Sequence, residues 1–258
     1  MLARASASLA LCALLIAGCA SDPPVFEEPP PADDLYQEGL TVLQGRRILG
    51  VYHKVDYNRA IETFQAIIDS YPYSDYAVTA ELKIADSYFD DQRYEEALSY
   101  YRDFGDLHPQ HEKVPYTIFR SGLCHERRMR STNRDQTATR DALVYLDRLL
   151  ATYPHSEYAE EAEVLWRDLR TQLAQSVMGI ADFYRKRGEY ESAAERYRSL
   201  LNEYPGLGLD PEALYRLGIC YSNMNRRTEA DRIFEAIVQN YHDSDVAGEA
   251  EKRIASGK

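Results

Sequence analysis

The densest group of potential metal ligands in the chain is the segment HPQHE, which contains His108, His111 and Glu112. Histidine and carboxylate side chains bind zinc, but a site needs three or four of them that converge in space. We interpret these residues as parts of a turn. The pair Asp90 and Asp91 also stands at an expected turn between helices, where helix ends and water satisfy carboxylates. We therefore assign no metal ligand and no general acid or base.

The sequence also lacks the common motifs that bring catalytic groups or phosphates together. HExxH, GxSxG, GxGxxG and GxxxxGK followed by Ser or Thr are all absent. The 258 residues include 30 basic and 42 acidic side chains, which gives a formal net charge of -12. Generic binding to nucleic-acid phosphates needs a dense basic face, so this balance argues against it. We expect a protein that is not an enzyme, has no cofactor and binds no nucleic acid.

Cys19 is the residue with the clearest chemistry. It ends the sequence LLIAGC, after Arg4 and an acid-free apolar run over residues 9–17 that is too short to cross a bilayer. The branched apolar residue, two small residues and cysteine resemble a bacterial lipobox, in which the thiol accepts lipid before cleavage. We expect residues 1–18 to be a signal peptide and Cys19 to carry covalent lipid; the alternative is an ordinary signal peptide. Ala20 is not the aspartate associated with inner-membrane retention, which favours the outer membrane.

Residues 19–34 are predicted to form a lipidated tether. The segment ASDPPVFEEPPPADD, residues 20–34, holds five of the eleven prolines, a composition typical of a stiff, solvated chain without a core. At roughly 3.1 Å per residue this segment reaches about 45 Å. We therefore expect the folded part to stand off the membrane in the periplasm.

An internal repeat organises the chain after residue 34. Five times, an alanine in a helix-favouring segment is followed twelve residues later by the proline of a Tyr-Pro or His-Pro pair, or by a histidine. An aromatic residue or leucine stands four residues after each alanine, which predicts one amphipathic helix per repeat, closed by proline. The alanines are Ala60, Ala97, Ala142, Ala193 and Ala230, and the closing residues are Pro72, Pro109, Pro154, Pro205 and His242.

A second set of small residues precedes three of these alanines by twelve positions: Ala85, Ala181 and Gly218. Small residues at fixed points let two antiparallel helices approach closely. These offsets resemble the tetratricopeptide repeat, and the alanine intervals of 37, 45, 51 and 37 compare with that family's period of 34. We predict an all-α fold, an α-solenoid of five tetratricopeptide-like helix pairs. Cys124 and Cys220 stand at equivalent positions two repeats apart, too far for a disulfide, so we expect both to be core residues.

Three segments interrupt the regular spacing. The 51-residue interval includes residues 157–187, which lack proline and predict a long central helix that holds Trp166 as a packing residue. This helix joins repeats 1–3, residues 35–155, to the C-terminal part with repeats 4–5, residues 156–258. Residues 45–54 are an insertion placed to cover or reshape the N-terminal groove. Residues 127–141 predict a surface loop whose arginines form a solvated face or dock a partner: Arg127, Arg128, Arg130, Arg134 and Arg140.

The first helix of each tetratricopeptide-like pair lines a concave surface. If Gly39, Ala85 and Gly122 set the phase, the inward positions of the first three repeats are apolar or aromatic, which suits an extended or amphipathic peptide. The alternative is that some of these side chains pack against neighbouring helices. The candidate groove residues are Tyr36, Leu40, Leu43, Leu82, Phe89, Tyr116, Phe119 and Leu123. The corresponding positions of the fourth repeat are charged: Asp182, Arg185 and Lys186.

The lipobox, the tether and the repeats together resemble the BamD (ComL) family of outer-membrane lipoproteins. HPQHEKVPY, residues 108–116, resembles that family's His-Pro turn, and residues 133–162 resemble its third repeat with an Arg-Asp loop. The resemblance implies a scaffold in the outer-membrane β-barrel assembly (BAM) complex, where it works with other BAM lipoproteins. Its C-terminal half would bind the POTRA domain of the BamA-type insertase, and its N-terminal half the C-terminal segments of unfolded outer-membrane proteins.

Arg196 matches the position of a family arginine that pairs with the insertase, so the resemblance implies an insertase contact there. The alternative for Arg196 is a solvated residue on a helix face. The alternative for the whole chain is a lipoprotein scaffold for another envelope machine, such as a type IV pilus pilotin.

Overall fold

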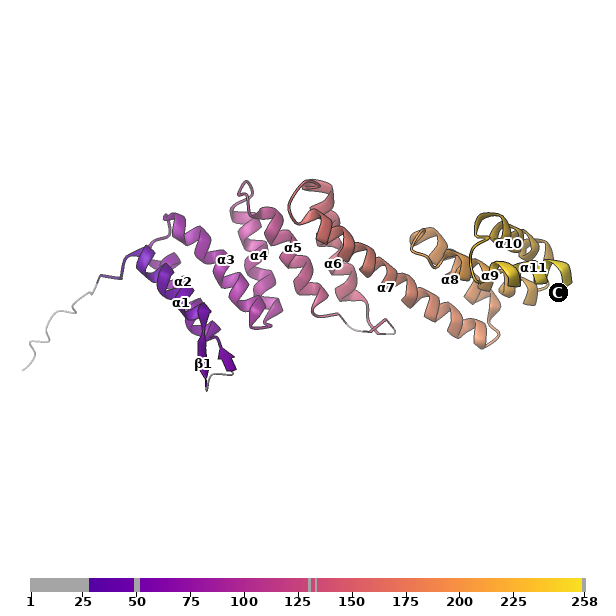
Figure 1. The fold of residues 1–258 in the computed structure, drawn as a ribbon, viewed down its shortest axis with the longest axis horizontal. Coiled ribbons are helices and arrows are strands. Elements are labelled where there is room, and N and C mark those ends of the chain that lie inside the picture. Colours follow the sequence, from indigo (N-terminus) through magenta and orange to yellow (C-terminus); the bar gives the residue numbers. More distant parts are fainter. Residues whose placement is uncertain (1–27, 49–51, 130, 133, 257–258) are drawn as a thin grey trace, which may run out of the picture.

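The computed structural model describes residues 28–48, 52–129, 131–132 and 134–256, so the whole predicted signal peptide, Cys19 and the tether up to residue 27 lie outside it. Within these residues an elongated row of helices carries one two-stranded hairpin (Figure 1). No helix there is both long enough and apolar enough to cross a membrane. The elements are α1 (Ala32–Gln44), β1 (Arg46–Ile48), β2 (Tyr52–Lys54), α2 (Tyr57–Ser70), α3 (Asp75–Asp90), α4 (Tyr94–Leu107), α5 (Val114–Glu126), α6 (Thr137–Thr152), α7 (Ala159–Lys186), α8 (Tyr190–Glu203), α9 (Asp210–Asn223), α10 (Arg227–Asn240) and α11 (Ala247–Ser256).

The helices pack as consecutive pairs. These are α1 with α2, α3 with α4, α5 with α6, the C-terminal half of α7 with α8, and α9 with α10, while α11 packs on α10. The five repeat alanines all lie on the second helix of a pair, and each is at most 1% exposed. The predicted all-α solenoid of five tetratricopeptide-like pairs is therefore confirmed, with α11 as an addition beyond the last pair.

Small residues on the first helices allow the close approach that the sequence predicts. A Cβ atom on Gly218 would lie 2.6 Å from the Phe234 ring, and one on Gly39 would lie 2.6 Å from the Phe64 ring. Cys124 sits between helices in the same way: it is fully buried and free, and burial raises the pKa of its thiol to about 12. Cys220 is likewise buried and free, so both are core residues as predicted.

Adding one methyl group at Gly218 tests this packing. Overpacking a core destabilises the fold by about 1–3 kcal/mol, whereas replacing a helical glycine by alanine stabilises the helix by about 1 kcal/mol. We expect Gly218→Ala to lower the free energy of unfolding by about 1 kcal/mol in urea titrations. The matched control is Gly179→Ala in α7, where no atom lies within 4 Å of the added Cβ, and where a gain of about 0.5–1 kcal/mol is expected. Equal effects of the two substitutions would contradict the packing argument.

The long central helix is confirmed as α7, which has 28 residues. Its N-terminal half packs on α6, where the Trp166 indole N–H donates to Asp147 at 2.7 Å. One turn further on, the Arg170 guanidinium lies 4.7 Å from the Trp166 ring and donates to the Glu203 carbonyl oxygen at the end of α8. Trp166 and Arg170 therefore brace the junction between the N-terminal and C-terminal repeats.

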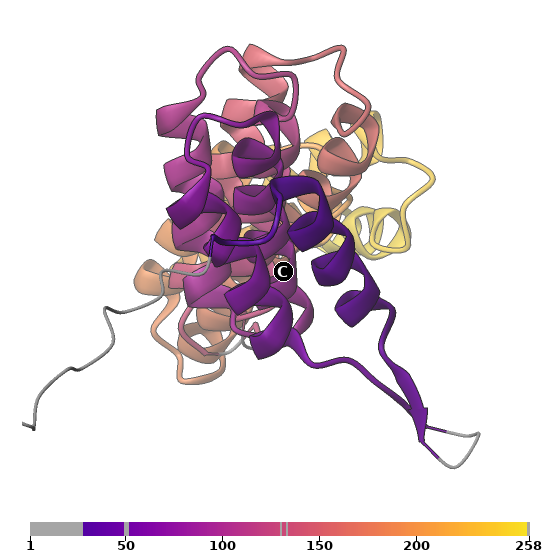
Figure 2. The ribbon, with the colours of Figure 1, turned by 90° about the vertical axis from the view of Figure 1, so that its left-hand side faces the viewer.

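The structure corrects three boundaries of the prediction. Helix α1 begins at Ala32, so residues 32–34 are helical and the tether ends earlier than position 34. The loop predicted over 127–141 ends at Gln136, because α6 begins at Thr137. Two of its arginines pair with nearby acids, Arg128 with Glu95 and Arg127 with Glu126; Arg130 lies outside the described residues. The insertion at 45–54 holds the strands β1 and β2, which the sequence did not predict, and they point away from the helical body (Figure 2).

His125 makes stability depend on pH. It is 8% exposed at the end of α5 and stacks on Tyr145, and burial lowers its pKa even though Asp141 lies 3.7 Å away. Below the ordinary histidine pKa of about 6.5, the unfolded chain takes up a proton that the folded chain does not. The free energy of unfolding therefore falls as pH drops from 7.5 to 5.5. We expect His125→Gln to reduce this fall in thermal unfolding, and the exposed His155→Gln to leave it unchanged; equal slopes would contradict the assignment.

Candidate protein-binding site

A cavity of about 330 Å³ opens between the first helices of the N-terminal repeats. Its walls come from α1, α3, α5 and the residue before α7, which are the helices predicted to line the concave surface. Lys83 and Lys113 are its cations; among the described residues Lys83 forms no ion pair, and Lys113 lies 4.0 Å from Glu157. The full lining is Tyr36, Thr79, Leu82, Lys83, Asp86, Lys113, Tyr116 and Tyr158. The cavity thus combines aromatic rings with two accessible positive charges.

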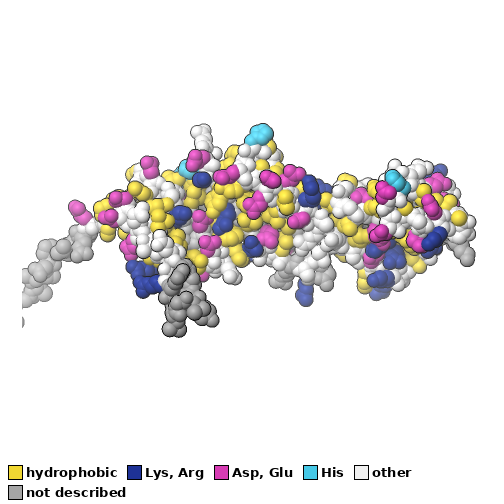
Figure 3. Space-filling view, viewed as in Figure 1, with side chains coloured by type: hydrophobic (Ala, Val, Ile, Leu, Met, Phe, Trp, Pro, Cys, Tyr) yellow, Lys and Arg dark blue, Asp and Glu magenta, His cyan; other side chains and the backbone are white. Residues whose placement is uncertain are grey.

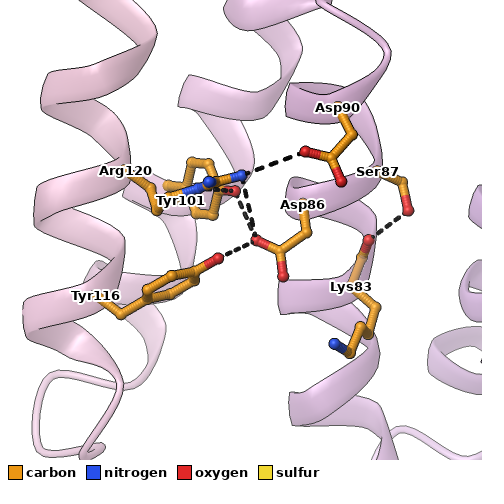
Figure 4. A network of polar contacts seen from close by, with 7 residues as sticks. All are labelled: Lys83, Asp86, Ser87, Asp90, Tyr101, Tyr116 and Arg120. Atoms are coloured by element: carbon orange, nitrogen blue, oxygen red, sulfur yellow. Dashed lines mark hydrogen bonds and ion pairs between the residues drawn. The ribbon is translucent and has the colours of Figure 1, made fainter.

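Asp86 organises the wall of this cavity (Figure 4). One oxygen of its carboxylate accepts hydrogen bonds from the Tyr101 hydroxyl at 2.7 Å and the Tyr116 hydroxyl at 2.6 Å. Arg120 donates to the Tyr101 hydroxyl at 2.9 Å and lies 3.9 Å from Asp86 and 3.8 Å from Asp90. These contacts join α3, α4 and α5, so the orientation of the Tyr116 ring is fixed before any ligand arrives.

Burial raises the pKa of several acidic groups around the cavity. It raises the pKa of the Tyr116 hydroxyl well above its usual value, and the charge of Asp86 adds to the effect. Burial, reinforced by Glu157, raises the pKa of Tyr158 to about 12. Burial also raises the pKa of the Asp90 carboxyl, against the opposing attraction of Arg120. Both tyrosines are therefore neutral hydrogen-bond donors at physiological pH.

The polar network recurs in the C-terminal half. The Tyr197 hydroxyl donates to Asp182 at 2.5 Å and Arg216 pairs with the same carboxylate. Asp182 and Arg216 are 34 residues apart, and so are Asp86 and Arg120, since 120 minus 86 is 34. In both halves the tyrosine follows the aspartate by 15 residues. The repeat therefore carries an Asp–Tyr–Arg triad at two equivalent junctions between helix pairs.

The two triads differ in the residues around them. Phe89 lies under Arg120, with the guanidinium 3.7 Å from the ring centre, whereas Arg185 holds the equivalent position beside Asp182. Tyr116, which precedes Arg120 by four residues, is replaced at the equivalent position by Glu212, which binds Arg216 at 2.6 Å. The N-terminal surface is thus more aromatic and the C-terminal surface more charged. The sequence predicts a purely apolar and aromatic N-terminal surface, and the structure corrects this, because charged side chains also lie there. Figure 3 shows hydrophobic and charged side chains interleaved over one face of the N-terminal helices.

The structure brings three of the eight candidate groove residues into the cavity: Tyr36, Leu82 and Tyr116. Phe119 is only 4% exposed and stacks on Tyr158, so it is a core residue that a peptide cannot reach. Leu123 packs in the same cluster as Phe119. The remaining candidates lie outside the cavity, with Leu40 and Leu43 packed against the first helix pair and Phe89 against Tyr94 and Arg120.

The sequence interpretation missed five polar residues of the cavity: Thr79, Lys83, Asp86, Lys113 and Tyr158. A signal for Asp86 was available, because Asp, Tyr and Arg recur at identical offsets in two repeats. Lys113 and Tyr158 lie at the starts of helices, where the repeat pattern carries no information about which side chains converge.

Arg196, the candidate insertase contact, is exposed on α8. Its guanidinium lies 5.2 Å from the ring centre of Tyr184 on α7, and it forms no ion pair with another described residue. Tyr184 in turn lies 5.6 Å from the exposed ring of Phe183. Arg196 therefore presents an unneutralised charge beside an aromatic surface.

Comparison with known proteins assigns the chain to a family. The family model YfiO, described as an outer membrane lipoprotein, matches residues 31–233, which span all five helix pairs except the last turns of α10. The chain belongs to this family. The YfiO match begins at the residue before α1, so it covers the part of the chain that forms the solenoid and its cavity.

Three curated proteins similar to this YfiO family chain are each described as outer membrane protein assembly factor BamD. The protein of Caulobacter vibrioides is 28% identical over 86% of this chain and 71% of its own length. That of Vibrio cholerae is 29% identical over 80% and 88%, and that of Rickettsia prowazekii is 26% identical over 94% and 93%. Among solved structures, the TPR2AB-domain complex with pHSP90 of yeast Sti1 is 15% identical, with a TM-score of 0.47 and coverage of 88% and 82%. The repeat assignment rests on the helix contacts above.

Proposed function

We propose that this chain is an outer-membrane protein assembly factor, a lipid-anchored scaffold without enzymatic activity that faces the periplasm. Its membership of the YfiO family, together with the BamD relatives that match most of its length, carries the proposal. In this role Cys19 holds the lipid that anchors the chain to the outer membrane. The solenoid binds proteins at two places and works with an insertase of the BamA type and other BAM lipoproteins.

The N-terminal cavity is the proposed receptor for the C-terminal segments of unfolded outer-membrane proteins. Such a segment is extended and apolar and ends in an aromatic side chain and a free carboxylate. Tyr36, Leu82 and Tyr116 offer apolar contact for the terminal ring, and Lys83 and Lys113 offer charge-assisted hydrogen bonds to the carboxylate. A cavity of about 330 Å³ suits one large side chain rather than a whole folded domain.

The surface around Arg196 is the proposed contact for the POTRA domain of the insertase. An arginine on a half-buried tyrosine, next to the exposed ring of Phe183, is a composition typical of interface hot spots. Arg196 is free to pair with an acidic side chain of the partner, since no described residue of this chain neutralises it. The two proposed partners thus contact different halves of the chain: the substrate the first three helix pairs, and the insertase the surface where α8 packs on the C-terminal half of α7.

Calorimetric titration tests the insertase contact. The mature chain carrying Cys19→Ser, which cannot be lipidated, is titrated with the soluble periplasmic domain of the insertase from the same organism. We expect specific binding, weakened at least about tenfold by Arg196→Glu because a charge pair is replaced by repulsion. Arg198→Glu changes the same charge on another face of α8, where the side chain is also exposed, and serves as the control.

Three results are informative. Loss of affinity in Arg196→Glu but not in Arg198→Glu supports both the family role and the contact. Binding that is unchanged by Arg196→Glu keeps the role and discards the contact. Absence of binding by the folded wild type contradicts the proposal and favours a scaffold for another envelope machine.

A further inference from the structure

The β1–β2 hairpin is a basic projection on an acidic protein. Its antiparallel register pairs Arg46 with Lys54 and Arg47 with His53. No acidic residue occurs between positions 45 and 55, although the whole chain has a formal net charge of -12. The hairpin follows α1 and points away from the helices (Figure 2).

This register is unfavourable for an isolated hairpin. Like charges at directly opposed positions destabilise a strand pair, and a two-stranded hairpin on its own is marginally stable. Three other helix pairs, α3–α4, α7–α8 and α9–α10, have an interval of 12 residues between the small residue and the repeat alanine, whereas the interval from Gly39 to Ala60 is 21 residues. The opposed Arg46 and Lys54 therefore weaken an insertion that the repeat does not need, unless anions neutralise them.

A cavity of about 590 Å³ at the root of the hairpin adds a third cation. It is lined by Arg46, Lys54 and Arg59, together with Glu38 and Asp56. Arg59 pairs with Glu38 at 2.8 Å, and Asp56 accepts a hydrogen bond from the Arg59 backbone as the N-cap of α2. Both acids are thus engaged with Arg59, and Arg46 and Lys54 form no ion pair with any other described residue. Basic side chains gather at this place in Figure 3, beside the grey hairpin tip.

We propose that the hairpin stem and its root cavity dock on anionic phospholipid headgroups of the membrane to which the chain is anchored. Membership of an outer membrane lipoprotein family puts the chain at a bilayer. From position 19 to the start of α1 at Ala32 an extended chain covers about 40 Å at roughly 3.1 Å per residue. The headgroup surface is therefore within reach of the hairpin. This inference goes beyond the proposed function but rests on the lipid anchor that the proposed function includes.

Docking at this place has a structural consequence. A lipid on Cys19 fixes one point of the chain, which leaves the solenoid free to rotate about the tether. A second contact at Arg46 and Lys54 would hold α1 near the membrane surface and orient the row of helices relative to it. Phosphate groups would neutralise the opposed Arg46 and Lys54, so the hairpin itself would become more stable when bound.

Vesicle flotation tests the proposal with the full mature chain carrying Cys19→Ser, so that covalent lipid cannot supply the binding. The vesicles are pure phosphatidylcholine or phosphatidylcholine with one quarter phosphatidylglycerol. We expect partition into the anionic vesicles only, and weaker partition as salt is raised. Each basic side chain near an anionic surface raises the partition coefficient about fivefold. We therefore expect Arg46→Glu/Lys54→Glu to lower the partition coefficient at least about 25-fold. The control Arg198→Glu/Arg232→Glu makes the same charge change on the exposed faces of α8 and α10.

Circular dichroism and thermal unfolding check that each variant folds like the wild type. Selective loss in the hairpin variant supports the proposal. Equal loss in the two variants would show a net-charge effect and overturn it. Equal binding to neutral and anionic vesicles, or no binding to either, would overturn it as well.

Discussion

Asp182→Ala is expected to lower the free energy of unfolding by about 3 kcal/mol. The Asp182 carboxylate accepts the Tyr197 hydroxyl at 2.5 Å and pairs with Arg216 and with Arg185, which lies 3.5 Å away. Tyr197 is fully buried, and the two arginine side chains are only about a quarter exposed. Removing their shared acceptor leaves a buried hydroxyl and two cations without it, and each such group costs about 1–3 kcal/mol.

The coupling energy within this network is measured by urea unfolding of three variants: Asp182→Ala, Tyr197→Phe and the double variant. We expect a coupling energy above about 1 kcal/mol between Asp182 and Tyr197, because the two side chains share one hydrogen bond. Asp245→Ala removes an exposed carboxylate from the same half of the chain and serves as the control. A loss below about 0.5 kcal/mol for Asp182→Ala would show that the triad does not hold α7, α8 and α9 together.

Lys83→Glu/Lys113→Glu is expected to weaken binding of a C-terminal peptide at least about 30-fold. The probe is a synthetic peptide of ten residues that ends in phenylalanine with a free carboxylate. Hydrogen bonds to charged groups contribute about 1.5–3 kcal/mol each, and both lysines line the cavity with little neutralisation from this chain. Reversing both charges replaces attraction by repulsion at the position proposed for the carboxylate.

The amidated form of the same peptide makes this test specific. Fluorescence anisotropy is expected to show that wild type prefers the free carboxylate, and that the double variant does not distinguish the two peptides. Lys186→Glu/Arg198→Glu, on the exposed surfaces of α7 and α8, makes the same change in net charge away from the cavity. Should the control weaken binding as much as the cavity variant, the peptide would not bind where we propose.

The repeat architecture could be predicted from sequence because its signal is local and recurs. Ala60, Ala97, Ala142, Ala193 and Ala230 mark five helices, and each helix ends just before the predicted closing pair. Gly39 and Gly218 also recur at equivalent positions, on the first helix of a pair, where the missing Cβ makes room for an aromatic ring of the second helix. The hairpin could not be predicted in this way, because residues 45–54 belong to no repeat and their pairing depends on the loop that joins two helices.

The candidate site was harder to predict than the fold. Helical phase placed Tyr36, Leu82 and Tyr116 on one surface, and the structure brings them together. The same reasoning included Phe119, which is buried, because phase gives the direction of a side chain but not whether a neighbouring helix covers it. It left out Asp86, whose hydrogen bonds to Tyr101 and Tyr116 depend on three helices at once.

The central claim is that this chain serves the assembly of outer-membrane β-barrel proteins. Depletion of the chain in its own organism, followed by quantitative proteomics of the outer-membrane fraction, tests it most directly. The account predicts a broad loss of β-barrel proteins, restored by the wild-type gene and restored less well by Arg196→Glu. A defect confined to one envelope machine, such as loss of pili with normal β-barrel proteins, would contradict it.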